Sequence, residues 1–270
     1  MLQLRTRLSV PAVLLVGLGT AAPLVAQTTP DAAAVSALAY RSGAATSAAA
    51  QDFLFGTPNG TLSFRVGRLF ARSDGEVHAH TFRNLTVEPR DLDALALGAD
   101  LGFRLAGRVD AVFGAGFSRT SVRSEMRDWV DLDDEPIRQT TRFRQVPLTV
   151  GARLYVTPPG RSISQFAWIP ARTALYVSGG VGLAHYAYEQ EGEFVDEVDE
   201  IIFPDTLRSS GWAQLFYLGG GAELRVTRRA ALVADVRYTH GSAHPDGDFG
   251  GLYDIGLGGL ATSIGLALTF

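Results

Sequence analysis

The 270-residue sequence has no cysteine and no lysine, so all 24 basic residues are arginines. Without cysteine the chain has no disulfide scaffold, no thiolate zinc site and no thiol nucleophile. Acidic residues number 28, and the formal net charge of −4 leaves no basic surplus for a nucleic-acid backbone, so no nucleic-acid partner is expected. Charged residues make up only 19% and hydrophobic residues 46%, a balance that excludes a disordered protein.

A hydrophobic run long enough for a transmembrane helix is also lacking. Near the start, Arg5 and Arg7 precede an apolar run over 10–16, which small residues follow as far as Ala26. This run is short for a membrane span, and glycine and proline interrupt its surroundings. The order of charged, apolar and small residues predicts that residues 1–26 are a secretory signal, cleaved after Ala26. We therefore expect the mature chain to be exported.

The next segment, residues 27–59, is rich in alanine, serine and threonine. Its composition favours a mobile periplasmic leader. A short helix that packs under or inside the following domain is the alternative, because alanine favours helix.

From residue 60 the hydrophobic pattern has a period of two. In the segment 260–270, large apolar side chains at even positions alternate with small or weakly polar ones. Such alternation is typical of a β-strand with one apolar face. Eight segments share the pattern, and they are 61–72, 95–105, 109–118, 146–156, 173–188, 216–226, 232–238 and 260–270.

The connections between these segments alternate in length. Two are tight turns, one is a longer proline-containing turn, and four are long and polar. In chain order they are 73–91, 106–108, 121–141, 157–171, 189–210, 227–229 and 241–256. Short turns at one end and long loops at the other predict an all-β fold, an eight-stranded antiparallel up-and-down transmembrane β-barrel over 60–270. An even number of strands places both termini at the short-turn end, in the periplasm.

The two faces of the strands indicate which side meets lipid. The apolar face is too crowded with large side chains to fill an eight-stranded interior, and the segments are longer than ordinary soluble strands. We therefore expect it to face outward. A secreted lipocalin-like barrel, with the faces reversed, is the alternative. In the membrane arrangement the inward face holds nine charges that pair and fill the lumen. They are Arg65, Asp100, Arg104, Asp110, Arg153, Glu223, Arg225, Asp235 and Arg237.

Aromatic residues fall near both ends of the predicted strands, as in the girdles of membrane barrels. The group beside the long loops is Tyr186, Tyr188, Trp212 and Tyr238, and the group at the other end is Tyr155, Tyr176 and Phe270.

The final strand, 260–270, ends in Phe270 with an apolar residue at every second position before it. This ending resembles the small outer-membrane β-barrel family, which comprises OmpA-type transmembrane domains, OmpX-like and OmpW-like proteins. The resemblance covers about residues 60–270. It implies an outer-membrane protein that Phe270 directs to the barrel-insertion machinery, with outer-membrane lipid and lipopolysaccharide as partners. We expect a monomer with a structural or surface-interaction role and a charged, largely filled lumen of little or no conductance. A narrow channel for small solutes is an alternative.

A further alternative is enzymatic. His240 and Ser242 share the outward face where the seventh strand leaves the membrane, and this resembles the lipid A 3-O-deacylase family. An acid would have to orient the histidine, and the candidates are Asp246, Asp248 and Asp254. The sequence departs from that family, which has asparagine where Ala243 follows the serine and uses a glutamate as its acid. The favoured interpretation is two polar residues at a strand end, without catalysis.

Neither metal nor cofactor is expected. Carboxylates cluster over 128–135 and 189–200, but their spacing does not match a calcium loop. The histidines His78 and His80 share one face without an identifiable third ligand.

Overall fold

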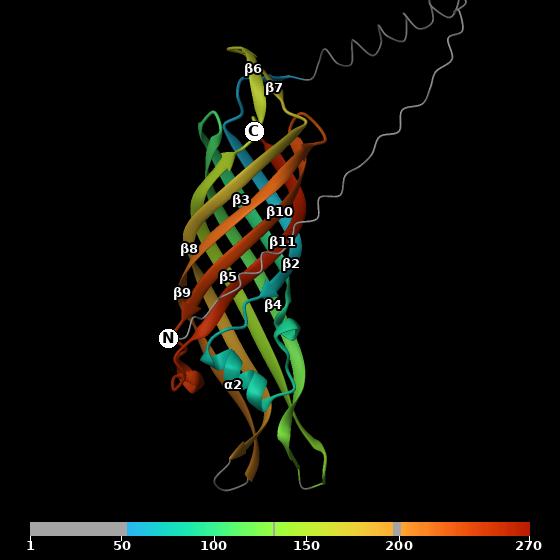
Figure 1. Cartoon of the computed structure of the whole chain (residues 1–270), viewed down its shortest axis with the longest axis vertical. Coiled ribbons are helices and arrows are strands. Elements are labelled where there is room, and N and C mark those ends of the chain that lie inside the picture. Colours follow the sequence, from blue (N-terminus) through green and yellow to red (C-terminus); the bar gives the residue numbers. More distant parts are fainter. Residues whose placement is uncertain (1–52, 132, 197–200) are drawn as a thin grey trace, which may run out of the picture. The chain divides into compact units, whose positions relative to one another are not determined.

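The computed structural model describes residues 53–131, 133–196 and 201–270. Eight antiparallel strands form a closed barrel in the order β10-β11-β2-β3-β4-β5-β8-β9, which confirms the predicted up-and-down fold (Figure 1). The predicted signal and most of the leader lie outside the described residues. The barrel strands are β2 (Gly60–Ala71), β3 (Ala94–Ala106), β4 (Val109–Val130), β5 (Pro136–Tyr155), β8 (Thr173–Asp196), β9 (Ile201–Arg225), β10 (Ala230–Ala243) and β11 (Ile255–Thr269).

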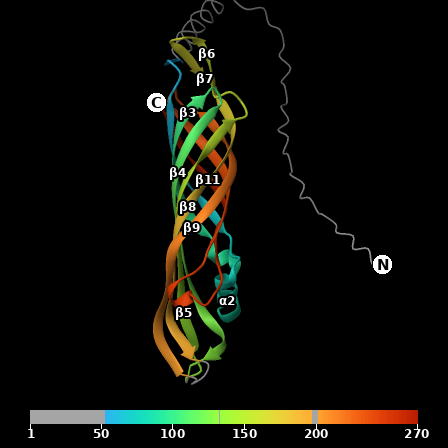
Figure 2. The same cartoon turned by 90° about the vertical axis from the view of Figure 1, so that its left-hand side faces the viewer.

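Two of the four long connections are not loops. The segments 121–141 and 189–210, predicted as polar loops, instead continue the strands as hairpins. The pairing of β8 with β9 runs unbroken from Thr173 to Asp196. Figures 1 and 2 show the two hairpins extending beyond the other strands. The prediction was wrong because both faces are partly polar there, so the contrast between alternate residues is weak.

The connection 73–91 contains a helix, α2 (Glu76–Asn84), and a 3-10 turn, η1 (Pro89–Leu92). Asp254, in the connection between β10 and β11, holds the start of α2. Its carboxylate accepts from the Glu76 amide at 3.0 Å and its carbonyl from the Val77 amide at 3.1 Å. A second 3-10 turn, η2 (Gly247–Phe249), lies in the same connection between β10 and β11 as Asp254. None of the described helices is long and apolar enough to cross a bilayer.

The opposite end of the barrel carries the short turns. The predicted turn 157–171 folds into β6 (Gly160–Ser164) and β7 (Ala167–Pro170), which form a small sheet with β1 (Leu54–Phe55). The carbonyl of Phe270 accepts hydrogen bonds from the amides of Asn59 and Gly60. The first described residues and the carboxyl terminus therefore lie together at the short-turn end.

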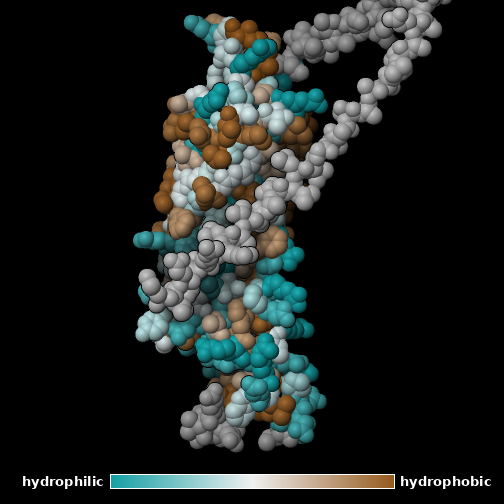
Figure 3. All heavy atoms as spheres, in the orientation of Figure 1, coloured by the Kyte–Doolittle hydropathy of each residue, from teal (hydrophilic) through white to brown (hydrophobic). Residues whose placement is uncertain are grey.

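Large apolar side chains point outward from every barrel strand, as the alternation predicted. In Figure 3 hydrophobic surface gathers over the half of the barrel nearer β6 and β7, and hydrophilic surface over the other half. We call the first region the apolar band. Exposed members, one from each strand in chain order, are Phe64, Leu97, Phe113, Val150, Leu183, Leu218, Leu232 and Ile264.

Candidate functional site

The barrel interior holds all nine charged side chains that the alternation placed there. Six are buried, and the other three, Arg104, Arg225 and Arg237, are partly buried. Their ion pairs join strands that are not neighbours in the barrel. Arg153 on β5, for example, lies 3.3 Å from the Glu223 carboxylate on β9, although β8 separates these strands. The charges therefore pair across the interior of the barrel.

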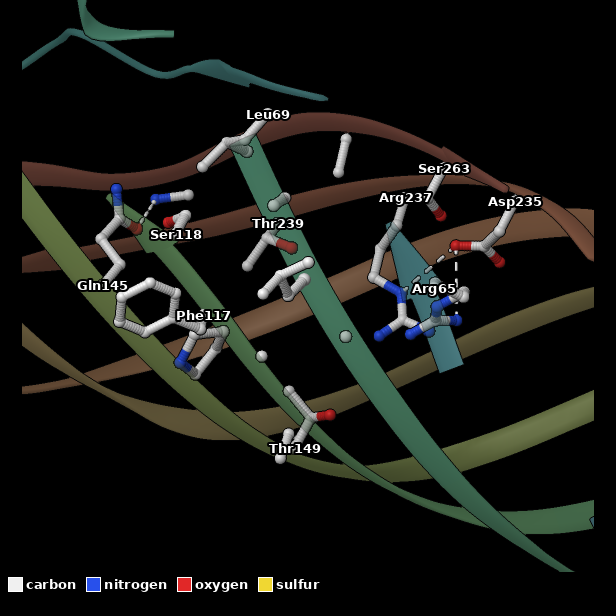
Figure 4. Close-up of a pocket in the computed structure, with 18 of the residues that line it drawn as sticks. Arg65, Leu69, Phe117, Ser118, Gln145, Thr149, Asp235, Arg237, Thr239 and Ser263 are labelled. Carbon is white, nitrogen blue, oxygen red and sulfur yellow. Dashed lines mark hydrogen bonds and ion pairs between the residues drawn. The ribbon is translucent and has the colours of Figure 1, made fainter. Parts of the chain in front are cut away.

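Asp100 is the centre of this network. Its carboxylate lies 2.7 Å from an Arg65 nitrogen, 3.0 Å from one of Arg237 and 3.6 Å from one of Arg153. Asp235 supports the arrangement, because it lies 3.6 Å from Arg65 and 3.8 Å from Arg237 (Figure 4). A buried carboxylate that accepts from several guanidinium groups offsets the loss of its hydration.

Two of the remaining charges complete the network toward the short turns. Arg104 on β3 pairs with Asp110 on β4. Arg225 on β9 donates to the Thr269 hydroxyl at 2.9 Å.

Tyrosines share the interior with the charges. Tyr176 donates its hydroxyl to Asp235 at 2.8 Å, and Tyr155 donates to Glu223 at 3.0 Å. Both side chains are buried, so their assignment to an outer aromatic girdle was wrong. The alternation along the strand already indicated an inward position, since Tyr155 is two residues from Arg153 and shares its inward face.

Arginine planes stack on these rings. The guanidinium carbon of Arg153 lies 4.5 Å from the ring centroid of Tyr176, and that of Arg237 lies 4.6 Å from that of Tyr217. Such stacking satisfies a desolvated guanidinium where no further acceptor is available. Tyr217, which the sequence analysis did not single out, is thereby part of the site.

Inward-facing glycines make room for the tyrosines. A Cβ atom added to Gly221 would lie 2.5 Å from the Tyr176 hydroxyl, and one added to Gly151 would lie 2.6 Å from the Tyr217 hydroxyl. The structure shows that these two accommodate aromatic rings, a pairing that strand parity alone could have suggested.

Aromatic and aliphatic side chains pack together at the end of the barrel beside the long connections. Tyr186 and Tyr188 are buried there, so their placement in a girdle was also wrong, whereas Trp212, Tyr238 and Phe270 are exposed as a girdle requires. The rings of Tyr188 and Phe249 pack at 5.3 Å between centroids. The cluster around them is Val77, Phe143, Tyr186, Tyr188, Ala213, Phe249, Ile255 and Leu257.

His78 on α2 packs against this cluster and is fully buried. Its Nε2–H donates to the Gly256 carbonyl at 3.2 Å. Desolvation lowers the pKa of the imidazole below 6.5, although this hydrogen bond and the charges of Asp74 and Asp254 oppose the shift. The neutral imidazole therefore belongs to the docked position of α2. His80 lies on the exposed side of α2, so the two histidines do not converge on a metal.

A cavity of about 110 Å³ lies beside the charge network. Both polar and apolar side chains line it, and the residues that Figure 4 labels around it come from several strands. Part of the wall is Leu69, Ser118, Gln145, Thr149, Leu215 and Thr239, with Arg65, Asp235 and Arg237 on one side. A space of this size holds a few water molecules.

The structure does not bring together the residues of the enzymatic alternative. His240 packs on the exterior against Phe216, with ring centroids 4.9 Å apart. Its Nε2 lies 3.1 Å from Nη1 of Arg72, and because arginine only donates, Nε2 is the acceptor and its lone pair is occupied. Among the described residues no hydrogen bond joins His240 to Ser242 or Asp254. Asp254 instead binds the start of α2.

The other acids proposed to orient the histidine also have different partners. Asp246 accepts from the Ser210 amide at 3.1 Å, and Asp248 accepts from the Arg208 amide at 2.8 Å. They hold the connection between β10 and β11 against β9. This hydrogen bonding leaves the Ser242 hydroxyl without an assembled base and acid.

The acidic clusters are used in part for ion pairs. Glu189 and Glu191 on β8 each lie 2.6 Å from Nη1 of Arg142 on β5. Over the described residues, no three acidic or histidine side chains are grouped so as to hold a metal ion.

No protein-family model matches the chain, and no curated protein matches it. Solved structures do. Ail of Yersinia pestis, an attachment invasion locus protein determined in complex with sucrose octasulfate, is 12% identical, and the match covers 78% of this chain and 99% of Ail at a TM-score of 0.39. Neisserial surface protein A is 10% identical, with 78% and 96% covered and a TM-score of 0.40. A major outer membrane protein from Thermus thermophilus is 13% identical, with 78% and 99% covered and a TM-score of 0.37.

Proposed function

We propose that this chain is an integral barrel of the outer membrane, with a structural or surface-interaction role and a lumen of little or no conductance. The observation that carries the proposal is the inverted arrangement of the barrel. Large apolar side chains face outward from all eight strands, while the buried face holds the paired charges around Asp100.

Water is a poor surrounding for this exterior. A monomeric soluble protein seldom exposes a continuous apolar surface of more than several hundred Å². A barrel in a bilayer hydrogen-bonds its whole backbone and places such a surface against acyl chains. The partners we propose are therefore outer-membrane lipid and lipopolysaccharide.

The interior supports a closed lumen. An ion that entered would have to pass the cluster around Tyr188 and Phe249, then the network around Asp100. Opening the network would leave buried charges unpaired, which costs several kcal/mol. A role outside the lumen follows, and the long hairpins β4–β5 and β8–β9 supply the surface for it.

Biogenesis is the second part of the proposal. The strand β11 pairs with β2 from Gly259 to Thr269 and so closes the barrel, and the Phe270 side chain beyond it is 58% exposed. We propose that the barrel-insertion machinery recognises β11 and the Phe270 side chain at its end. The Phe270→Ser variant should then accumulate uninserted in cells, whereas Phe166→Ser, in the turn between β6 and β7, should insert normally.

Planar-bilayer recording on the full chain tests the closed lumen. The protein is purified in detergent, reconstituted, and its insertion is verified by protease protection of the barrel. We expect no steady channels. Large, steady openings from an inserted barrel would overturn the closed-lumen proposal. A chain that remains monomeric in buffer without detergent would overturn the membrane location.

A further inference from the structure

Three arginines on the exterior of β4 and β5 have no ion-pair partner in the part of the chain that the structure describes. Arg119, Arg123 and Arg144 are exposed, and they make no side-chain hydrogen bond or ion pair with a described residue. Arg119 and Arg144 are direct partners in the register of the two strands. Directly opposite residues have Cβ atoms about 5 Å apart, a spacing at which like charges repel.

The neighbouring strands offer no acid at this level. Leu95 on β3 pairs with Arg119, and Ala187 on β8 pairs with Arg144. Two residues further out on β5, Arg142 shows the opposite situation, because Glu189 and Glu191 neutralise it. Acidic side chains therefore neutralise Arg142, whereas the positive charges of the neighbouring Arg119 and Arg144 are not neutralised.

The position of the pair relates it to the apolar band. On β4 the outward residues of the apolar band end at Phe117, and Arg119 is the first of a run of polar outward residues. On β5 the outward residues from Leu154 to Val146 are apolar, and Arg144 is the next. Both arginines therefore stand at the border of the band on the long-hairpin side. In a bilayer this is the level at which hydrocarbon gives way to headgroups.

We infer that Arg119 and Arg144, with Arg123 about 13 Å further along β4, form a binding site for the phosphate groups of an anionic lipid in the adjacent leaflet. The site rests on the proposed membrane location. A phosphate between the two guanidinium groups accepts paired hydrogen bonds and replaces their repulsion by attraction. The acyl chains of the same lipid lie along Phe117 and Leu95. Arg123 is within reach of a second phosphate on a bis-phosphorylated glycolipid.

Native mass spectrometry of the full chain in detergent tests the site, with bis-phosphorylated lipid A and its fully dephosphorylated form as probes. The double variant Arg119→Gln and Arg144→Gln should bind the phosphorylated lipid at least about tenfold more weakly. Arg138→Gln is the matched control. It removes an exposed arginine from the same face of β5, six residues further out, and should change the affinity less than about twofold.

Dephosphorylated lipid A should bind the wild type and both variants equally. An unchanged affinity of the double variant for the phosphorylated lipid overturns the site. In a competition experiment, inorganic phosphate is added at the concentration of the lipid. Displacement of the lipid would show that the arginines bind free phosphate and would overturn their assignment to a lipid site. Protease protection in the same preparations separates the two proposals. An inserted barrel without phosphate preference overturns the site alone, whereas a barrel that does not insert overturns the membrane location as well.

Discussion

Asp100 and Arg237 meet across the barrel, with 3.0 Å between the Asp100 Oδ2 and Arg237 Nη2 atoms, although β2 and β11 lie between their strands. They are 137 residues apart in the sequence. The interior is thus held by side chains that span the lumen, in addition to the hydrogen bonds between neighbouring strands.

The Asp100→Asn substitution tests the importance of the shared anion. Asparagine keeps the shape but leaves Arg65, Arg153 and Arg237 without their common counter-charge. We expect the free energy of unfolding to fall by about 3–5 kcal/mol, the usual cost of breaking a buried ion pair. Urea titration of the reconstituted barrel measures this change. Asp133→Asn, an exposed residue in the β4–β5 hairpin, should change the value by less than about 0.5 kcal/mol, and equal effects of both substitutions would contradict the central role of Asp100.

The Gly221→Ala substitution tests the space that the tyrosines need. The added methyl group would lie 2.5 Å from the Tyr176 hydroxyl and would also press against the Ala234 carbonyl oxygen. We expect a loss of about 1–3 kcal/mol of unfolding free energy, because a packed interior resists added volume. Gly107→Ala is the control, since nothing lies within 4 Å of the added atom. If the Gly221→Ala and Gly107→Ala variants had the same free energy of unfolding, the space at Gly221 would not be needed for Tyr176.

Acid should weaken the docking of α2 on the barrel. The pKa of His78 is lowered by burial in the folded chain, so an undocked α2 takes up a proton that the docked helix resists. The stability of docking is therefore complete above pH 6.5 and declines as the pH falls below that value. Hydrogen-exchange protection of the α2 amides, corrected for intrinsic rates, should fall over this range.

His78→Leu should abolish the pH dependence of this protection, whereas His80→Gln, on the exposed side of the same helix, should keep it. Equal protection of α2 in the wild type at pH 5 and pH 8 would show that His78 does not control docking.

The period-two pattern predicted the barrel because apolar and polar faces differ sharply within the apolar band. The pattern fails where that contrast is lost. Outside the band both faces of β4 and β5 carry polar residues, such as Arg123 outward and Gln139 inward, so these extensions resembled loops.

The candidate site could be predicted only in part. Parity placed the nine charges inward, but partners such as Arg237 and Asp100 depend on distances across the lumen, which no local pattern encodes. The position of Tyr176 near a strand end suggested a girdle, whereas its inward parity decided its burial. Docking of α2 was missed because it depends on contacts with residues far along the chain, such as those with Asp254 and Gly256.

The most direct test of the account asks which medium the outward face meets. Because the chain has no cysteine, a single spin label can be attached at Leu266→Cys, within the apolar band, or at Ser121→Cys, on the exterior beyond it. In reconstituted vesicles the label at 266 should collide often with oxygen, which dissolves in lipid, and rarely with a water-soluble nickel complex. The label at 121 should show the reverse. Nickel collisions as frequent at 266 as at 121 would contradict the assignment of the apolar band to lipid.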